Sequence, residues 1–157
     1  MLALVALASI LVVQADAQQP PPPPPPLLVH GYVYFDNGSD VPRPFGEIDP
    51  IAHLVEGMPP DVYPYVRGQT DSVGSVAANL ALARRRAEAV ARLAVAEGVD
   101  PSRITLVVCN EAELNRPTAD EISEPLNRFA LFNWSSQPPQ PTEHCTPEPY
   151  RPSEGRR

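Results

Sequence analysis

One charged residue lies on the apolar side of the longest predicted helix. Residues 77–97 have helical spacing, and on a wheel of about 100° per residue their alanines, leucines and valines fill an arc of about 200°. Arg86 falls inside this arc between Leu93 and Val90, with Asn79 two turns earlier on the same line. An unpaired guanidinium buried there costs several kcal/mol, so Arg86 needs a partner.

Two interpretations of Arg86 are open from its position alone. It can snorkel to the edge of the sheet or form a structural ion pair, or it can bind an anionic ligand with Asp71 as its counterpart. Asp71 lies in the polar loop 68–74, which follows a predicted strand. Arg86 is about 13 Å along the helix, so that loop must fold back for the two to meet. The loop can equally be a glycine-rich turn in which Asp71 caps the helix.

A carboxylate and a guanidinium that flank one pocket can bind a free amino-acid end. Asp71 would hold the ammonium group, and the planar fork of Arg86 would hold the carboxylate through two parallel hydrogen bonds. Asn79 and backbone amides near the helix start would add donors for the same anion. The other charged residues of the helix, at positions 84, 85, 88 and 92, form an ordinary solvated face.

The elements that position these residues have the order β-α-β-α-β-β. Alternation predicts strands over residues 28–35, 62–67, 104–108 and 129–134, and helical spacing predicts helices over 45–57 and 77–97. Pro50 is tolerable in the first helix only if the regular helix begins near it. We therefore expect an α/β fold, an α+β sandwich with two main helices packed on one face of a mixed four-stranded sheet.

The ends of the chain have a different composition from its middle. The 157 residues have a net charge of −7 and include 22 prolines, many of them in residues 20–26 and 138–152. Residues 1–17 are predicted to be a cleaved signal peptide ending at Ala17, too short for a membrane span, although no Lys or Arg precedes the apolar run. No cysteine is near the cut, so no lipid anchor is predicted.

Residues 18–27 form a predicted linker, residues 28–134 the domain, and residues 135–157 a proline-rich disordered tail. Pro20–Pro26 should form a stiff polyproline II rod of roughly 20 Å, a spacer or, alternatively, a ligand for a proline-recognition module. The acidic balance excludes a general nucleic-acid coat.

At these residues the chain closely resembles the OmpA-like peptidoglycan-binding domain. The matching blocks are residues 34–36, the Gly-x-Thr-Asp-x-x-Gly loop 68–74, the helix residues 79–90, the helix-to-strand connection 98–104, and Asn127-Arg128. Several blocks in one order at the family's spacing are far more specific than one short motif. The resemblance covers residues 28–134, nearly the whole predicted domain.

The resemblance implies noncovalent binding of the diaminopimelate residue of peptidoglycan stem peptides. Asp71 would bind the ammonium group and Arg86 the carboxylate, the same assignment that the helix wheel suggests. By the same resemblance Asp36, Thr70 and Asn79 would line the pocket and Arg128 would support it. The resemblance also implies a periplasmic location, where the domain would tether or stabilise the cell envelope and could associate with the outer membrane. It implies no cofactor.

Three positions depart from the family's pattern. Gln69 stands where histidine is usual, residues 108–110 replace a glycine-aromatic-glycine connection, and Phe129 stands where a second arginine is common. These changes affect the rim and the charge of the expected pocket. An alternative is therefore a module of the same fold that no longer binds the wall and contacts other envelope proteins instead.

Cys109 and Cys145 are the only cysteines, and a periplasmic location makes a disulfide between them the default. Such a bond would fold the tail back across the domain. A remote alternative is an enzyme with Cys109 as nucleophile and His53 or His144 as base, but neither histidine shares a motif with Cys109. No metal-type spacing occurs, so we expect no metal site and no enzyme.

Overall fold

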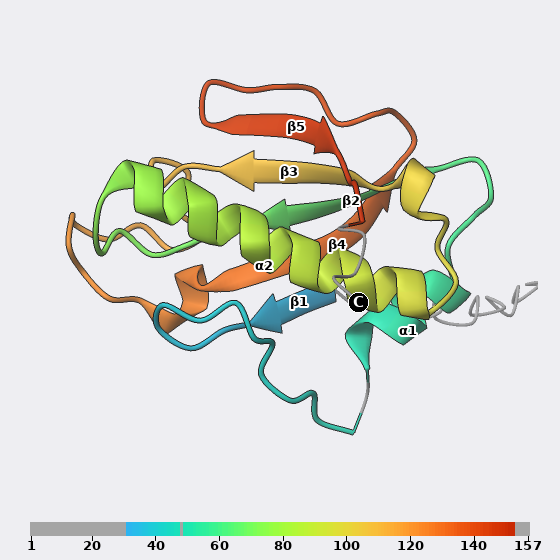
Figure 1. Cartoon of the computed structure of the whole chain (residues 1–157), viewed down its shortest axis with the longest axis horizontal. Helices are drawn as coiled ribbons and strands as arrows, with labels where there is room; N and C mark the ends of the chain where they lie inside the picture. The colour runs from blue at the N-terminus through green and yellow to red at the C-terminus, as the bar shows by residue number, and fades with distance from the viewer. Residues whose placement is uncertain (1–30, 48, 153–157) are drawn as a thin grey trace, which may run out of the picture.

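The computed structural model describes residues 31–47 and 49–152. Within them the chain forms two helices, two short 3-10 helices and five strands (Figure 1). Their order is β1 (Gly31–Tyr34), α1 (Pro50–Glu56), β2 (Tyr63–Gly68), α2 (Val76–Ala96), η1 (Pro101–Arg103), β3 (Thr105–Cys109), η2 (Pro125–Asn127), β4 (Phe129–Ser135) and β5 (Cys145–Pro149). The predicted signal peptide and proline linker lie outside the described residues.

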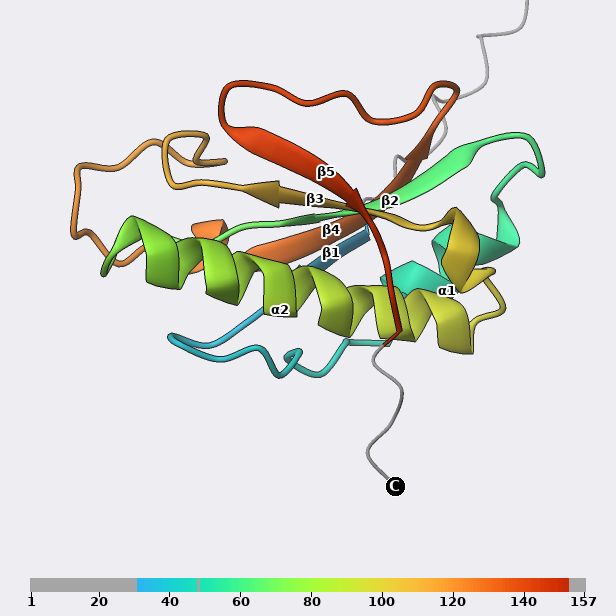
Figure 2. The same cartoon turned by 45° about the horizontal axis from the view of Figure 1, so that its top comes forward.

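One mixed sheet is the base of the fold, with strand order β1-β4-β2-β3-β5. Strands β2 and β3 run parallel and are joined through α2, whereas the other three neighbouring pairs are antiparallel. Both helices lie on the same side of this sheet (Figure 2). The predicted α+β class with two helices on one face is therefore confirmed, and the strand count is five instead of four.

Helix α2 crosses the middle of the sheet and packs through small side chains. Ser75 caps its start by accepting a hydrogen bond from the Ala78 amide, and its alanines at positions 83, 87, 91 and 94 are fully buried. This packing needs a glycine in the strand below: a Cβ on Gly68 would collide with the Ala83 carbonyl oxygen. The close approach puts the end of β2 directly under the middle of α2.

Helix α1 is shorter than the sequence pattern predicts. It begins at Pro50, and Asp49 caps it by accepting hydrogen bonds from the amides of Ile51 (2.8 Å) and Ala52 (3.3 Å). The predicted start at Phe45 is wrong because Pro50 fits only the first turn of a helix. Residues 45–47 are instead part of the loop that follows β1.

The prediction of a disordered tail is wrong for residues 145–150. Strand β5 pairs antiparallel with β3, opposite Val107 and its neighbours, and Tyr150 is 6% exposed in the main core. The Tyr150 amide also donates to the Ile104 carbonyl at 2.9 Å. Pro147 and Pro149 are compatible with a strand here because β5 is the last strand of the sheet order and needs a partner on one side only.

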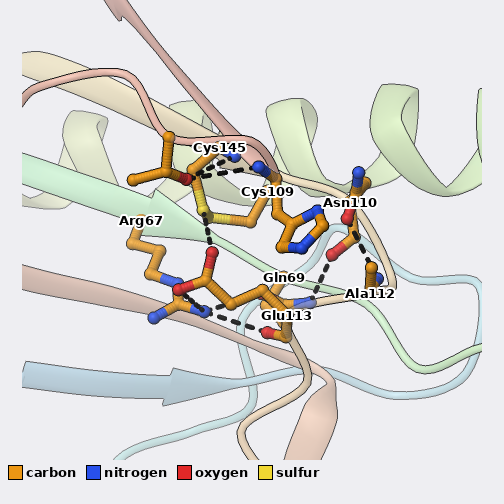
Figure 3. Close-up of a disulfide and its surroundings, with 9 residues drawn as sticks. Arg67, Gln69, Cys109, Asn110, Ala112, Glu113 and Cys145 are labelled. Atoms are coloured by element: carbon orange, nitrogen blue, oxygen red, sulfur yellow. Dashed lines mark hydrogen bonds and ion pairs between the residues drawn. A yellow bond between two sulfur atoms is a disulfide. The ribbon is translucent and has the colours of Figure 1, made fainter.

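The disulfide between Cys109 and Cys145 confirms the predicted pairing and joins β3 to β5. The two residues are direct cross-strand partners with Cα atoms 4.0 Å apart. Figure 3 shows the bond beside Arg67 and Glu113, with α2 behind the strands. The tail is therefore held by a covalent bond, a strand ladder and a buried tyrosine together.

No helix within the described residues is long and apolar enough to cross a membrane.

Candidate functional site

Arg86 is fully buried and donates hydrogen bonds to three backbone carbonyls. Its Nε donates to Ser39 (2.9 Å), Nη1 to Gln69 (3.0 Å) and Nη2 to Asp36 (3.1 Å). Its guanidinium carbon also lies 5.1 Å from the centre of the Phe35 ring. Arg86 therefore ties the loop after β1 and the end of β2 to the middle of α2, which gives it a structural role in this state.

Burial also changes the acidity of this guanidinium. Desolvation lowers the pKa of Arg86 to about 10, because burial disfavours the charged form, and the nearby Asp71 carboxylate opposes part of that shift. Arg86 is still positively charged near neutral pH. A buried cation here attracts negative groups more strongly than an exposed one does.

Asp71 is 4% exposed and forms its ion pair with Arg128, not with Arg86. The Arg128 Nη1 lies 3.1 Å from the Asp71 Oδ2 and also donates to the Ser123 hydroxyl at 2.9 Å. The Ser123 hydroxyl in turn donates to the same carboxylate oxygen at 3.4 Å. Among the described residues there is no Asp71–Arg86 ion pair within 4.0 Å. The Asp71 carboxylate is still near enough to Arg86 to affect its pKa electrostatically.

The other predicted pocket residues divide into two groups. Thr70 and Asn79 lie in the buried region: the Asn79 side chain donates to Glu111 at 2.8 Å, and the Thr70 hydroxyl has no hydrogen-bond partner among the described residues. The Asp36 side chain points outward, 70% exposed, in an ion pair with Arg43 at 3.0 Å. Asp36 thus contributes only its backbone carbonyl to the cluster.

The cluster therefore consists of two cations, the Asp71 carboxylate and several polar groups at the end of β2, and Glu111 contacts it through Asn79. Asp71, Arg86, Arg128, Thr70 and Asn79 come together from the loop after β2, from α2 and from the start of β4. A carboxylate and guanidinium groups in one cluster are the groups that bind an ammonium and a carboxylate of a ligand, respectively.

Comparison with known proteins identifies the family to which this architecture belongs. The family model described as "OmpA family" matches residues 34–128, more than half of the chain. The chain belongs to the OmpA family. The resemblance predicted from the loop 68–74 and from α2 is thereby confirmed.

Individual relatives agree with this assignment. Outer membrane porin F of Pseudomonas fluorescens is 38% identical over 90 residues, which cover 57% of this chain and 26% of the porin, so the chain spans about a quarter of that relative. The peptidoglycan-associated lipoprotein of Burkholderia pseudomallei is 28% identical, with a TM-score of 0.55 over 66% of this chain and 89% of its own. The periplasmic domain of Helicobacter pylori MotB shares the fold at 20% identity, with a TM-score of 0.50 over 66% and 75% of the two chains.

In this OmpA-family domain, two of the three positions that depart from the family's sequence pattern, Gln69 and residues 108–110, are in contact beside the cluster. Gln69 is fully buried, and its side-chain amide donates to the Asn110 carbonyl at 3.2 Å, next to the disulfide at Cys109. The Gln69 amide oxygen also accepts a hydrogen bond from Arg67 at 3.3 Å. These contacts fix the loop that follows β3, which also contributes Glu111 to the site.

The third departure, Phe129, is buried in an aromatic group on β1 and β4. Its ring centre lies 5.0 Å from that of Tyr32 and 6.5 Å from that of Tyr34, both edge to face. A second arginine is thus replaced by an apolar contact between strands, and the charge of the cluster depends on Arg86 and Arg128.

Sequence reasoning missed the roles of Glu111 and Ser123 and the two backbone carbonyls that Arg86 contacts in the β1 loop. Each of these groups is far along the chain from its partner: Glu111 contacts Asn79 across 32 positions, and Ser123 contacts Asp71 across 52. No spacing rule in the sequence signals such a contact. The sequence indicates only that Glu111 is an acidic residue in the loop after β3.

The cysteine-enzyme alternative is excluded. Cys109 and Cys145 are joined in a disulfide, so neither supplies a thiolate nucleophile, and the OmpA family is structural rather than enzymatic. Glu113 lies near both sulfurs, with its Oε2 2.9 Å from the sulfur of Cys145. Oxidised sulfurs are not the thiolate ligands that a metal site of this composition requires.

Proposed function

We propose that this chain binds peptidoglycan noncovalently in the periplasm, by recognising the diaminopimelate residue of stem peptides. The observation that supports the proposal most directly is the buried Asp71–Arg128 pair beside Arg86, in a domain of the OmpA family whose relatives include a peptidoglycan-associated lipoprotein. The function is attachment: the domain tethers or stabilises the envelope and catalyses no reaction.

The ligand would replace internal partners of the cluster with equivalent ones. Its ammonium group would take the place of the Arg128 guanidinium at Asp71, and its carboxylate would take the place of backbone carbonyls at Arg86. Each exchange replaces one hydrogen bond to a charged group with another of the same kind. The unpartnered Thr70 hydroxyl and the Asn79 amide are further hydrogen-bonding groups in the same region.

Binding would require loops to open, because Asp71 and Arg86 are 4% and 0% exposed. One covering segment is the loop after β1, whose carbonyl at Ser39 contacts Arg86. The other is the segment before η2, where Ser123 contacts Asp71 and the Ser72 hydroxyl donates to the Ala119 carbonyl at 3.0 Å. Both segments are surface loops, the class of structure that moves most readily.

The second candidate is a domain of this fold that no longer binds the wall and contacts other envelope proteins. The hydrogen bond from Gln69 to the Asn110 carbonyl favours it, because that bond and the neighbouring disulfide stiffen one rim of the cluster. The predicted signal peptide, residues 1–17, and proline spacer, residues 18–27, are compatible with either candidate, since both place the domain outside the cytoplasm.

Co-sedimentation of the full chain with diaminopimelate-type sacculi tests the proposal. We expect Asp71→Asn to weaken binding by about 10- to 100-fold, the loss of one strong charge-assisted contact. It should also lower the melting temperature, because the buried Arg128 loses its ion-pair partner, so binding is measured below that temperature. The matched control is Asp40→Asn, which removes an exposed carboxylate paired with Arg85. No sedimentation of the wild type would favour the second candidate, whereas equal sedimentation of wild type, Asp71→Asn and Asp40→Asn would exclude Asp71 from the binding site.

A further inference from the structure

A hollow with a mostly apolar lining lies beside β1 and is separate from the charged cluster. It has a volume of about 720 Å³ and is lined by side chains from β1, the loop before α1, the first residue of α1 and η2. Its walls include Tyr32, Tyr34, Phe45 and Leu126. Strand β1 is one of the two edge strands in the sheet order (Figure 1), so the groove lies at an edge of the sheet.

The chemistry of the groove is aromatic and almost uncharged. Arg43 is the only charged residue among its described lining residues, and it already pairs with Asp36 at 3.0 Å. The Tyr34 hydroxyl is protonated near neutral pH, as a tyrosine ordinarily is, and can donate a hydrogen bond; burial raises its pKa further. Leu126 is 41% exposed although it is a large apolar residue. A groove of tyrosine and apolar side chains that can donate to carbonyls is the kind of surface that binds polyproline II segments.

We propose that this groove binds the chain's own proline run, Pro20–Pro26. Only residues 27–30 separate the run from Gly31, the first residue of β1, and four residues are enough for a reversal of chain direction. Seven prolines in polyproline II span roughly 20 Å, whereas the four residues of β1 span about 13 Å. The run is therefore long enough to pass along β1 and reach the segment around Phe45.

Three physical terms favour this occupant over another. A seven-proline run is already restricted to polyproline II, so docking costs little conformational entropy, and its carbonyls have no internal donors. A tether of four residues gives an effective concentration in the millimolar range, so even a weak site is occupied. A glycan strand, by contrast, needs several polar partners, and the lining offers few.

The consequence is a fixed orientation for whatever precedes residue 20. If the run is docked along β1, its Pro20 end would lie near the loop that contacts Arg86. The preceding chain would then leave the domain from that loop instead of from Gly31. The proposal does not depend on wall binding, because the groove and the charged cluster have no described lining residue in common.

Photo-cross-linking tests it on the full chain with a benzoylphenylalanine in place of Gln19, next to the prolines. We expect intramolecular cross-links to residues 43–46 and 125–126, with a yield independent of protein concentration. Leu126→Asp should reduce that yield several-fold, whereas Ile122→Asp, a matched control at 49% exposure outside the groove, should not. Cross-links spread over the domain, unchanged by Leu126→Asp, would overturn the proposal. Cross-links between chains that rise with concentration would overturn it in favour of a second copy.

Discussion

At the scale of single residues, Arg86 has the structural role that is one of the two alternatives left open by the sequence, and ligand binding by Arg86 is our proposal. It is a structural residue, since three backbone carbonyls accept its hydrogen bonds, and it is also part of the charged cluster with Asp71 and Arg128. The sequence could predict that Arg86 is buried and needs partners, because the helix wheel puts it among apolar residues. It could not predict that the partners are backbone carbonyls, since every residue has one and the residue types do not indicate which of them lies near Arg86.

Removing Arg86 should therefore destabilise the domain as well as affect binding. We expect Arg86→Ala to lower the free energy of unfolding by about 3 kcal/mol or more, because it leaves three buried carbonyls without a donor and opens a cavity. Urea unfolding under non-reducing conditions measures this. Arg85→Ala is the control, since Arg85 is half exposed and pairs with Asp40 on the surface. An equally small effect of both substitutions would show that the carbonyl contacts contribute nothing.

At the scale of elements, sequence patterns predict best the helices and strands whose apolar residues recur at regular spacing. Helix α2 begins and ends within one residue of its predicted bounds, because Ser75 and Gly98 mark its two ends. Strand β5 was missed because its prolines and polar residues have no apolar alternation. The pairing of Cys109 with Cys145, which the sequence did predict, contained the information that the tail returns to the sheet.

The disulfide should determine how tightly β5 is held. A closed loop spanning 36 positions contributes about 4 kcal/mol in the chain-entropy model, so Cys145→Ser should lower stability by roughly that amount. Hydrogen exchange should rise first at the amides of residues 145–150, while the amides of α2 stay protected. The matched comparison is Cys109→Ser, which removes the same bond from the other strand. Uniform loss of protection over the whole domain would contradict a separately released β5.

At the scale of the whole molecule, the net charge limits where affinity for peptidoglycan can come from. The chain has a net charge of −7, and peptidoglycan is itself acidic, so general attraction does not draw the two together. We therefore expect affinity to come from one specific site, and the site we propose is the cluster of Asp71, Arg86 and Arg128 at the junction of β2 and α2. The fold class could be predicted from the sequence, whereas the pairing of Asp71 with Arg128, 57 positions away, required the sheet to be assembled.

The most direct measurement of the central claim is competition by free diaminopimelate for sacculus binding of the full chain. A ligand with both an ammonium and a carboxylate group should release the protein in a dose-dependent way. Cadaverine, which has the ammonium groups and lacks the carboxylates, should not, because Arg86 then has no partner to gain. Binding that is unaffected by diaminopimelate, or released equally by cadaverine, would contradict recognition of an amino-acid end at Asp71 and Arg86.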